Sequence, residues 1–582
     1  MSSERQTGHT KFESPEGQLV SRLMGLETEY ATLIANRPDL ATADLPASAN
    51  IYSMICEAIR RDQPTVRGYY DADQMFLASG GAVTFESHPT LHAIPGGLVE
   101  IATPEVSSPD ELLACQRSID QLVTEAATKV DSPLDLRILK NSTDALGHVY
   151  GCQENYEAIV ATGVWLILYR ICVTVLWITQ IFSLIFTLPI LALTASLVFA
   201  IRLRHQQFAR AVRKSADSIE QGNGEQSVGQ LFETLPGWIK TTLTKLLRLV
   251  NWPTIVLLRL VAKQVAFRKQ RRFLAPLLVS RVALCGSGDL DHDGRFRLSA
   301  KAMAIDVVSD MGSYDGERPI FVFGHWIGQF CAKSFLSWTS TISMFKKRQR
   351  LQIGLSDSNL SDLAEYVKVG QVSLILDMIE SGQTKPLLRL PRVVRSLHEI
   401  TRDWNLVRRV RTSRGDMNAI EIQRHYLKAA KKFVAGVAIE RRGEAELVIT
   451  RWQELLDVVT AFRRDAKNMT PGLGRVDWLT KRWMIDQLGP GAQWIAKKKA
   501  DLRYHELSPE GYYQKLAASN PALVLIDPQR IEQRRRVPPS NSPAVKRGWL
   551  IREFGDGDAT VAAEWEYGIL GEGRHRKRID FK

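Results

Sequence analysis

Apolar and polar positions follow two different patterns along this chain, and the change of pattern divides it into segments. Before about residue 157 and after about residue 273, polar residues interrupt the apolar ones regularly. In the first of these parts, the start of RLMGLETEYATLI predicts a strand and Ala49–Arg61 has the spacing of a helix. A second helix, SSPDELLACQRSIDQLVTEAATK, begins with a capping serine, and Leu136–Lys140 returns to a strand. These elements predict a mixed α/β arrangement.

A stretch without any charged residue lies between the two parts, from Ile171 to Ile201. A bilayer core needs about 20 apolar residues in a helix, because only a helix satisfies its own backbone hydrogen bonds in lipid. This stretch is longer than one span, and core helices rarely extend so far without a polar face. We therefore expect membrane insertion, with a buried pair of core helices as the alternative.

Positive charge follows the uncharged stretch. The chain of 582 residues has a net charge of +13, and much of the excess lies between Arg202 and Arg272. There the segment PGWIKTTLTKLLRLVNWPTIVLLRLVAK sets apolar residues against Lys245, Arg248, Arg259 and Lys263, which suits a helix in the headgroup interface or a helix packed on a partner. Because the charge flanks a membrane segment, we expect lipid and no nucleic acid as its partner. The six cysteines are scattered without a CxxC pair, which fits a reducing compartment.

Carboxylates gather in four segments near predicted strand ends. In GLETEY, strand alternation places Glu27 and Glu29 on one face, where two acids repel unless a cation lies between them. The other segments are LVEIATPE with Glu100, KNSTDALGHVYGCQENY with Glu154, and RLQIGLSDSN, which begins at Arg350. Each segment alone also fits solvated acids or turn residues. Together they predict a sheet that carries oxygen ligands for a nucleotide-bound Mg²⁺.

These segments resemble the Pup ligase/deamidase family, which contains the ligase PafA and the deamidase/depupylase Dop. The matching stretches occur in the family's order: GLETEY, LVEIATPE, KNSTDALGHVYGCQENY, FLAPLLVSRVALCGSG, QRLQIGLSDSNLSD and RVPPSNSPAVKRG. The resemblance covers nearly everything except the N-terminal tail and about residues 158–270. It implies an α+β fold, in which a glutamine-synthetase-like β-sheet cradle binds ATP and Mg²⁺ and a small C-terminal domain follows.

The resemblance also divides the chain into parts and implies roles for single residues. We predict a disordered tail (1–20), a catalytic domain in two parts (21–157 and 271–499), an inserted membrane and basic region (158–270) and a C-terminal domain (500–582). Four glutamates on the matching segments are predicted metal ligands: Glu27, Glu29, Glu100 and Glu154. Three further residues are predicted to contact the nucleotide: Thr103, Arg350 and Trp565. A core aromatic is the alternative for Trp565.

The predicted catalytic carboxylate is Glu86, which stands where the family has an aspartate. Several neighbours also depart from the family pattern. Ala82 replaces an ATP-binding arginine, Thr84 replaces a metal-site tyrosine, and Gln153 and Gln352 each replace a histidine. Because charge stabilisation is usually the largest catalytic contribution, a non-catalytic member that serves as a nucleotide- or tag-binding membrane adaptor is one alternative for this chain.

The resemblance implies an ATP-dependent ligase that joins the C-terminal Glu of Pup to a lysine of a protein substrate. A deamidase or depupylase uses the same cradle, and a carboxylate–amine ligase with another substrate is a further alternative. We favour the ligase, because the segment between Glu29 and Gly80 lacks the long acidic loop of a deamidase. The stretch GSGDLDHDGRFRLS, by contrast, looks more like the deamidase branch.

The family match also constrains the uncharged stretch. Its two flanks belong to one domain of the relatives, so they must lie on the same side of a bilayer. We therefore predict a helical hairpin with its turn near Thr179–Gln180, or a re-entrant wedge bent at Pro189. The basic residues after Arg202 place both flanks, and with them the catalytic domain, in the cytoplasm.

Overall fold

The computed structural model describes residues 17–36, 46, 48–71, 73–86, 98–130, 134–213, 237–312, 316–330, 338–557 and 560–581. They form two compact units. Unit 1 comprises Met1–Ile159, Lys269–Val322 and Arg348–Lys582, and unit 2 comprises Val160–Arg268 and Phe323–Lys347. Most of the predicted tail lies outside the described residues. Its last residues are described, and Leu19 and Val20 are buried there rather than disordered.

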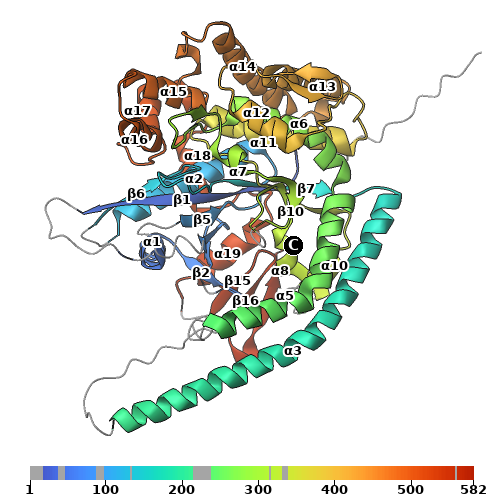
Figure 1. The fold of residues 1–582 in the computed structure, drawn as a ribbon, viewed down its shortest axis with the longest axis vertical. Coiled ribbons are helices and arrows are strands. Elements are labelled where there is room, and N and C mark those ends of the chain that lie inside the picture. The colour runs from blue at the N-terminus through green and yellow to red at the C-terminus, as the bar shows by residue number, and fades with distance from the viewer. Residues whose placement is uncertain are drawn as a thin grey trace, which may run out of the picture. The chain divides into compact units, whose positions relative to one another are not determined.

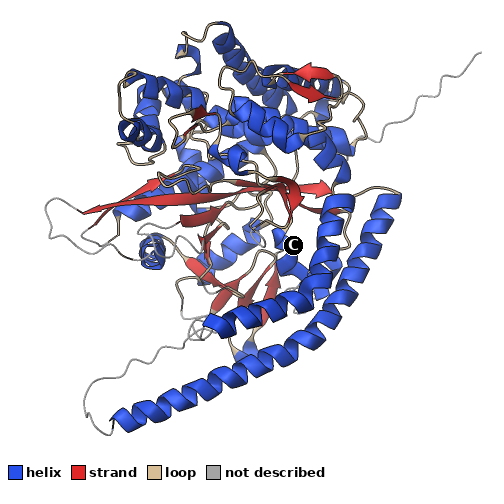
Figure 2. Cartoon of the chain, viewed as in Figure 1, coloured by secondary structure: helices blue, strands red, loops and turns tan. Residues whose placement is uncertain are grey.

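Unit 1 is built on a mixed sheet of 13 strands among the described residues (Figures 1 and 2). The strand order is β10-β11-β12-β7-β1-β5-β4-β3-β2-β15-β16-β17, and β6 also pairs with β1. The pairs β10–β11 and β2–β15 are parallel, and the others are antiparallel. This arrangement confirms the predicted α+β class. The C-terminal strands continue the same sheet, so residues 500–582 do not form a compact unit of their own.

The strands of this sheet are β1 (Met24–Asn36), β2 (Thr65–Gly68), β3 (Met75–Leu77), β4 (Ala82–Glu86), β5 (Leu98–Ala102), β6 (Leu134–Leu139), β7 (Gln153–Ile159), β10 (Val307–Asp310), β11 (Pro319–Val322), β12 (Arg348–Ile353), β15 (Val561–Ala563), β16 (Tyr567–Leu570) and β17 (Lys577–Asp580). Two short ribbons are β8 (Asp289–Leu290) with β9 (Phe296–Arg297), and β13 (Val410–Thr412) with β14 (Gly415–Met417).

The main helices of unit 1 are α1 (Ser48–Asp62), α2 (Pro109–Thr128), α6 (Arg268–Cys285), α7 (Ala300–Ala304), α11 (Asp362–Glu380), α12 (Val393–Thr401), α13 (Ala419–Ala435), α14 (Ala445–Arg464), α15 (Asp477–Gln487), α16 (Trp494–Tyr504), α17 (Tyr512–Ser519), α18 (Pro528–Arg536) and α19 (Ala544–Phe554). The predictions for β1, α1, α2 and β6 are confirmed. The serine cap of α2 is Ser108, whose Oγ accepts a hydrogen bond from the Glu111 N–H at 3.2 Å.

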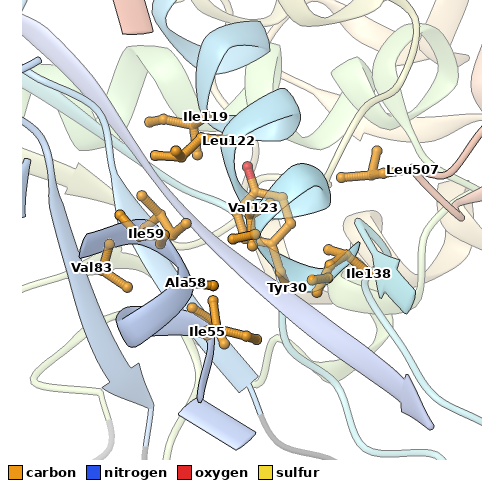
Figure 3. Packing of buried hydrophobic residues seen from close by; sticks show 14 of the residues in the cluster. Tyr30, Ile55, Ala58, Ile59, Val83, Ile119, Leu122, Val123, Ile138 and Leu507 are labelled. Carbon is orange, nitrogen blue, oxygen red and sulfur yellow. The ribbon is translucent and has the colours of Figure 1, made fainter. Parts of the chain in front are cut away.

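One face of β1 and its neighbours packs against α1 and α2 (Figure 3). Tyr30 of β1 and Val83 of β4 meet Ile55 of α1 and Val123 of α2 in this core. The Tyr30 hydroxyl donates to Asp120 Oδ1 of α2 at 2.6 Å, so its buried polar end is satisfied. The apolar residues of β1 that face α1 and α2 therefore fill the core and leave Glu27 and Glu29 to the other face of the sheet.

Buried charges join α2, α11 and the end of β6. Lys140 Nζ lies 3.1 Å from Asp120 Oδ2 and 3.2 Å from Glu365 Oε2, and Lys368 Nζ lies 2.6 Å from Glu365 Oε1. Burial alone would raise the pKa of Glu365, but Lys140, Lys368 and Arg117 outweigh it and hold that pKa at about 2. The carboxylate of Glu365 therefore stays charged in the core and links two helices to the sheet.

Unit 2 consists mainly of two long helices, α3 (Val164–Arg213) and α5 (Gly237–Leu260), which run side by side (Figure 1). Two short helices, α8 (Gly324–Gly328) and α10 (Trp338–Ser343), also belong to it. The hairpin turn predicted near Thr179–Gln180 is wrong, because α3 continues through it and through Pro189. The antiparallel partner of α3 is α5. By length and composition, Val164–Leu197 of α3 could cross a membrane, with a mean hydropathy of 2.1.

The Glu365 network predicts an acid-sensitive contribution to stability. A glutamate carboxyl ordinarily has a pKa of 4.5, and that of Glu365 is about 2. This difference corresponds to about 3 kcal/mol of folding stability at neutral pH. Because the folded-state pKa is the lower one, this contribution is present above pH 4.5 and is lost as the pH falls towards 2. We expect Glu365→Gln to lower the free energy of unfolding by about 3 kcal/mol at pH 7, measured by urea unfolding.

The matched control is Glu399→Gln, which removes an exposed ion pair with Arg395 on α12. It should change the free energy of unfolding by less than about 0.5 kcal/mol. Equal effects of the two substitutions at pH 7 would contradict the role given to the buried network.

Candidate active site

Three adjacent strands bring four of the predicted residues to one face of the sheet. Glu29 of β1 lies directly opposite Glu100 of β5, and Glu100 lies opposite Thr84 of β4. Cross-strand partners point to the same side of a sheet, and so do residues two apart in one strand. Glu27 and Glu86 therefore share this side with Glu29 and Glu100. We call these four glutamates the acidic face; it lies on the side of the sheet opposite the core residue Tyr30.

Two residues of β12 hold Glu27 in place. Its Oε1 lies 2.5 Å from Arg350 Nη2, and its Oε2 accepts a hydrogen bond from Gln352 Nε2 at 3.0 Å. Gln352 also donates to Gln153 Oε1 at 2.7 Å. The two glutamines that replace the family's histidines are therefore neighbours beside Glu27. Arg350 is predicted to contact the nucleotide, and in the structure its side chain pairs with Glu27 of the acidic face.

Glu29 is the more enclosed of the two acids on β1. Its Oε2 accepts a hydrogen bond from the Gly151 N–H at 2.9 Å, and its side chain is almost buried. Gly151 has a φ of 121°, and a Cβ at this position would lie 3.0 Å from Ser142 Oγ and from Ser358 Oγ. A glycine is therefore needed for the turn that presents this N–H to Glu29.

Glu154 does not belong to the acidic face, which corrects its grouping with the other three glutamates. Glu27 pairs with Gln153, so the next residue of β7 points to the opposite side of the sheet. There Glu154 is fully buried, and the guanidinium of Arg281 donates hydrogen bonds to both of its carboxylate oxygens, at 2.6 Å and 3.0 Å. Burial would lower the pKa of Arg281, but Glu154 outweighs it and raises that pKa. Glu154 is thus engaged in a structural ion pair.

Thr103 and Trp565 lie near the acidic face. The Thr103 Oγ1 accepts a hydrogen bond from the Leu26 N–H at 3.0 Å and so ties the end of β5 to β1. Trp565 follows β15 and packs edge to face on Phe76 of β3, with ring centroids 5.4 Å apart. Phe76 lies opposite Ala82, which lies opposite Ala102 and therefore shares the side of Glu100. The C-terminal tryptophan thus packs on the acidic side of the sheet.

Arg547 of α19 is a residue that the sequence analysis did not single out. Its buried guanidinium donates to the Gly80 carbonyl at 2.8 Å and to the Trp565 carbonyl at 2.7 Å, and forms an ion pair with Glu105. It also lies over the Trp565 ring, 4.6 Å from its centroid. Both partners of the ion pair occur in segments that match the family, but 442 residues separate them along the chain. Arg547 fixes Trp565 against the sheet.

The acidic face fits a divalent cation that arrives with a nucleotide. Among the described residues, no group of three or more His, Cys, Asp or Glu side chains could hold a metal ion by itself. Mg²⁺ in nucleotide sites needs only one or two carboxylates, together with phosphate oxygens and water. Glu29 and Glu100, opposite each other on adjacent strands, supply such a pair of oxygen ligands.

A hollow of about 540 Å³ lies elsewhere in unit 1. It is lined by residues of β2, of the C-terminal strands and of the loops that adjoin them, among them Arg67, Tyr69, Thr560, Glu572 and Arg576. None of the predicted site residues lines it. By register, Arg67 points to the same side as Met75 and Val83, which is opposite to the acidic face. This hollow is therefore separate from the predicted site.

Comparison with known proteins identifies the family. The model of the Pup-ligase protein family matches residues 22–569. The chain belongs to the Pup-ligase protein family. It is 24% identical to the Pup–protein ligase of Corynebacterium jeikeium over 579 residues, which cover 95% of this chain and 93% of that protein. It is also 22% identical to the depupylase of Acidothermus cellulolyticus, covering 94% of this chain and 90% of that protein.

Two solved structures of the Pup ligase PafA have the same fold. The structure of PafA in complex with Pup matches with a TM-score of 0.62 and 17% identity, covering 97% of this chain and 90% of that one. PafA in complex with ADP matches with a TM-score of 0.55 and 16% identity, covering 94% and 92% of the two chains. This similarity agrees with the mixed α+β fold of the present chain.

The placement of Glu154 leads to a prediction. Replacing it with glutamine leaves Arg281 buried without a charged partner, so Glu154→Gln should lower the free energy of unfolding by about 3 kcal/mol in urea. The protein that remains folded should bind Mg²⁺-ATP with unchanged affinity. A normal stability together with a lost metal dependence would instead favour Glu154 as a metal ligand.

Proposed function

We propose that this chain is a membrane-anchored, ATP-dependent carboxylate–amine ligase that joins the C-terminal Glu of Pup, or of a Pup-like protein, to a lysine of a protein substrate. The observation that carries the proposal is the acidic face, with Glu29, Glu100 and Glu86 in register on adjacent strands of a chain from the Pup-ligase family. The uncharged stretch Ile171–Ile201 of α3 supports the anchoring, with the catalytic unit in the cytoplasm.

In the proposed reaction, the γ-phosphoryl group of ATP is transferred to the side-chain carboxylate of the Glu of Pup. The lysine nitrogen then attacks the acyl phosphate, an amide bond forms and inorganic phosphate leaves. Glu29 and Glu100 would hold Mg²⁺, which supplies positive charge to the phosphate oxygens when it is bound. Thr103 and Trp565 border the nucleotide, and Arg350 keeps Glu27 in position.

Glu86 takes the part of the general base. A lysine is protonated at neutral pH and must lose a proton before its nitrogen can attack. Glu86 ends β4, and the register of this strand places the residue on the side of the sheet that carries Glu100. A glutamate keeps the carboxylate group of the aspartate that the family has at this position.

A depupylase is the second candidate function. The specific observation in its favour is the Acidothermus cellulolyticus depupylase, whose 22% identity over nearly the whole chain is close to that of the ligases. A depupylase would use the same face to hydrolyse the isopeptide bond. The same assay separates the two functions, since a ligase forms the conjugate and a depupylase removes Pup from it.

The test is an ATP-turnover and conjugation assay with the full chain in detergent, Pup ending in Glu and a lysine-bearing protein. We expect phosphate release and conjugate formation, and Glu86→Gln should slow conjugation by at least about 100-fold, as for loss of a general base. The control Glu57→Gln, on the exposed side of α1, should leave the rate unchanged. Unchanged conjugation in Glu86→Gln would remove the base assignment, and ATP binding without turnover would indicate an adaptor.

The metal assignment makes a separate prediction. Glu29 and Glu100 are like charges opposite each other, so each should contribute to Mg²⁺ binding. We expect Glu100→Gln to reduce the thermal stabilisation that Mg²⁺-ATP gives the protein, while the stabilisation by ATP with EDTA stays the same. An equal loss in both conditions would show that Glu100 does not act through the metal.

A further inference from the structure

The two long helices of unit 2 differ in the charged residues that they carry. From Ile171 to Ile201, α3 carries none. On α5 and just beyond it lie four cations at intervals that bring them to one side: Lys245, Arg248, Arg259 and Lys263. We call these four residues the cationic stripe. The helix α3 is therefore apolar between Ile171 and Ile201, whereas α5 is amphipathic and carries positive charge on one side.

The two helices are antiparallel and held in a fixed register. Thr179 Oγ1 lies 3.3 Å from Thr254 Oγ1, and Ser183 Oγ donates to the Val250 carbonyl at 3.2 Å. At the other end, the Phe267 N–H donates to the Val160 carbonyl at 2.7 Å, so the start of α3 and the chain after α5 come together. The two helices must therefore move together when they insert into a membrane or bind to its surface.

Among the described side chains of α3, the buried ones form one narrow stripe. It consists of residues spaced three or four apart: Tyr169, Val173, Leu176, Gln180 and Ser183. The other sides expose large apolar residues, for example Ile167, Phe182 and Phe186, each of which is about 60% exposed. Water is a poor environment for so long an apolar surface, whereas lipid acyl chains are a good one.

The outer side of α5 has the composition of a membrane interface. Trp238 and Trp252 are 73% and 62% exposed, and Leu249 between them is 70% exposed. Lys245, Arg248 and Lys263 are exposed on neighbouring positions. Tryptophan together with lysine and arginine beside an apolar strip is typical of helices that lie at the level of the lipid headgroups.

A pair that spans the bilayer is not compatible with this register. The longest run of α5 without a charge is Leu249–Leu258, ten residues and about 15 Å long, whereas the hydrocarbon core is about 30 Å thick. Because Thr254 is opposite Thr179, the uncharged run of α5 lies beside the first half of the apolar stretch of α3. A spanning pair would therefore hold Arg248 or Arg259 within the hydrocarbon, which is unfavourable by several kcal/mol.

We propose that the α3–α5 pair binds along the surface of a bilayer that contains anionic lipid. In this arrangement α3 is immersed among the acyl chains, and α5 lies above it at headgroup level with the cationic stripe on the lipid phosphates. The inference deepens the membrane anchoring proposed above by naming the lipid class and the orientation of the two helices. Lipid is favoured over a protein partner because the exposed surface is apolar on nearly every side of α3.

The test is co-flotation of the full chain with phosphatidylcholine vesicles, with and without phosphatidylglycerol. We expect much tighter binding to the anionic vesicles, and a loss of that difference at high salt. Each cation near a lipid surface strengthens binding roughly fivefold, so replacing all four residues of the stripe with glutamine should weaken it by more than about 100-fold. The matched control replaces four exposed cations of α13: Arg424, Lys428, Lys431 and Lys432. It should bind as the unmodified chain does.

Accessibility to a membrane-impermeant thiol reagent tests the orientation on the same vesicles. A cysteine at position 248 (Arg248→Cys) should react when the protein is bound, and one at position 178 of α3 (Ile178→Cys) should be protected. Equal binding to neutral and anionic vesicles, or protection at position 248, would overturn the inference. Because Pup conjugation is measured separately, a chain that binds anionic vesicles without conjugating Pup would contradict the proposed reaction and leave this inference intact.

Discussion

The antiparallel pairing of β1 with β5 and β7 is the constraint on which the rest of the molecule depends. Strand alternation gives β1 one apolar face, which fills the core with α1 and α2, and one face that carries Glu27 and Glu29. The register with β5 then sets Glu29 opposite Glu100. A slip of one residue in this pairing would turn the acids into the core, so core packing and the acidic face stabilise the same register.

Charge is placed in two different ways on the two sides of this sheet. On the core side, carboxylates are paired with buried cations: Glu154 with Arg281, and Glu365 with two lysines. On the other side, Glu27 is paired with Arg350, and Glu29 lies opposite Glu100 on the adjacent strand. Paired buried charges hold the elements together, whereas a like-charged pair is suited to a cation. We therefore propose a structural role for Glu154 and Glu365 and a metal-binding role for Glu29 and Glu100.

Much of this architecture could be predicted from the sequence, because local patterns determine it. Periodicity predicted β1, α1 and α2, and alternation in GLETEY correctly placed Glu27 and Glu29 on one face. The side of Glu154 could not be predicted, since it depends on the register between β1 and β7. The Arg547–Glu105 pair joins residues 442 positions apart, and the partner of α3 is a separate helix rather than its own second half. Such long-range pairings leave no local signal.

The most direct measurement is a crystal structure of the full chain with ADP and Mn²⁺, in which anomalous scattering locates the metal ion. The account predicts an anomalous peak beside the carboxylates of Glu29 and Glu100, with the nucleotide bordered by Thr103 and Trp565. A peak beside Glu154, or a nucleotide bound in the hollow around Arg67 with no metal at the acidic face, would contradict it.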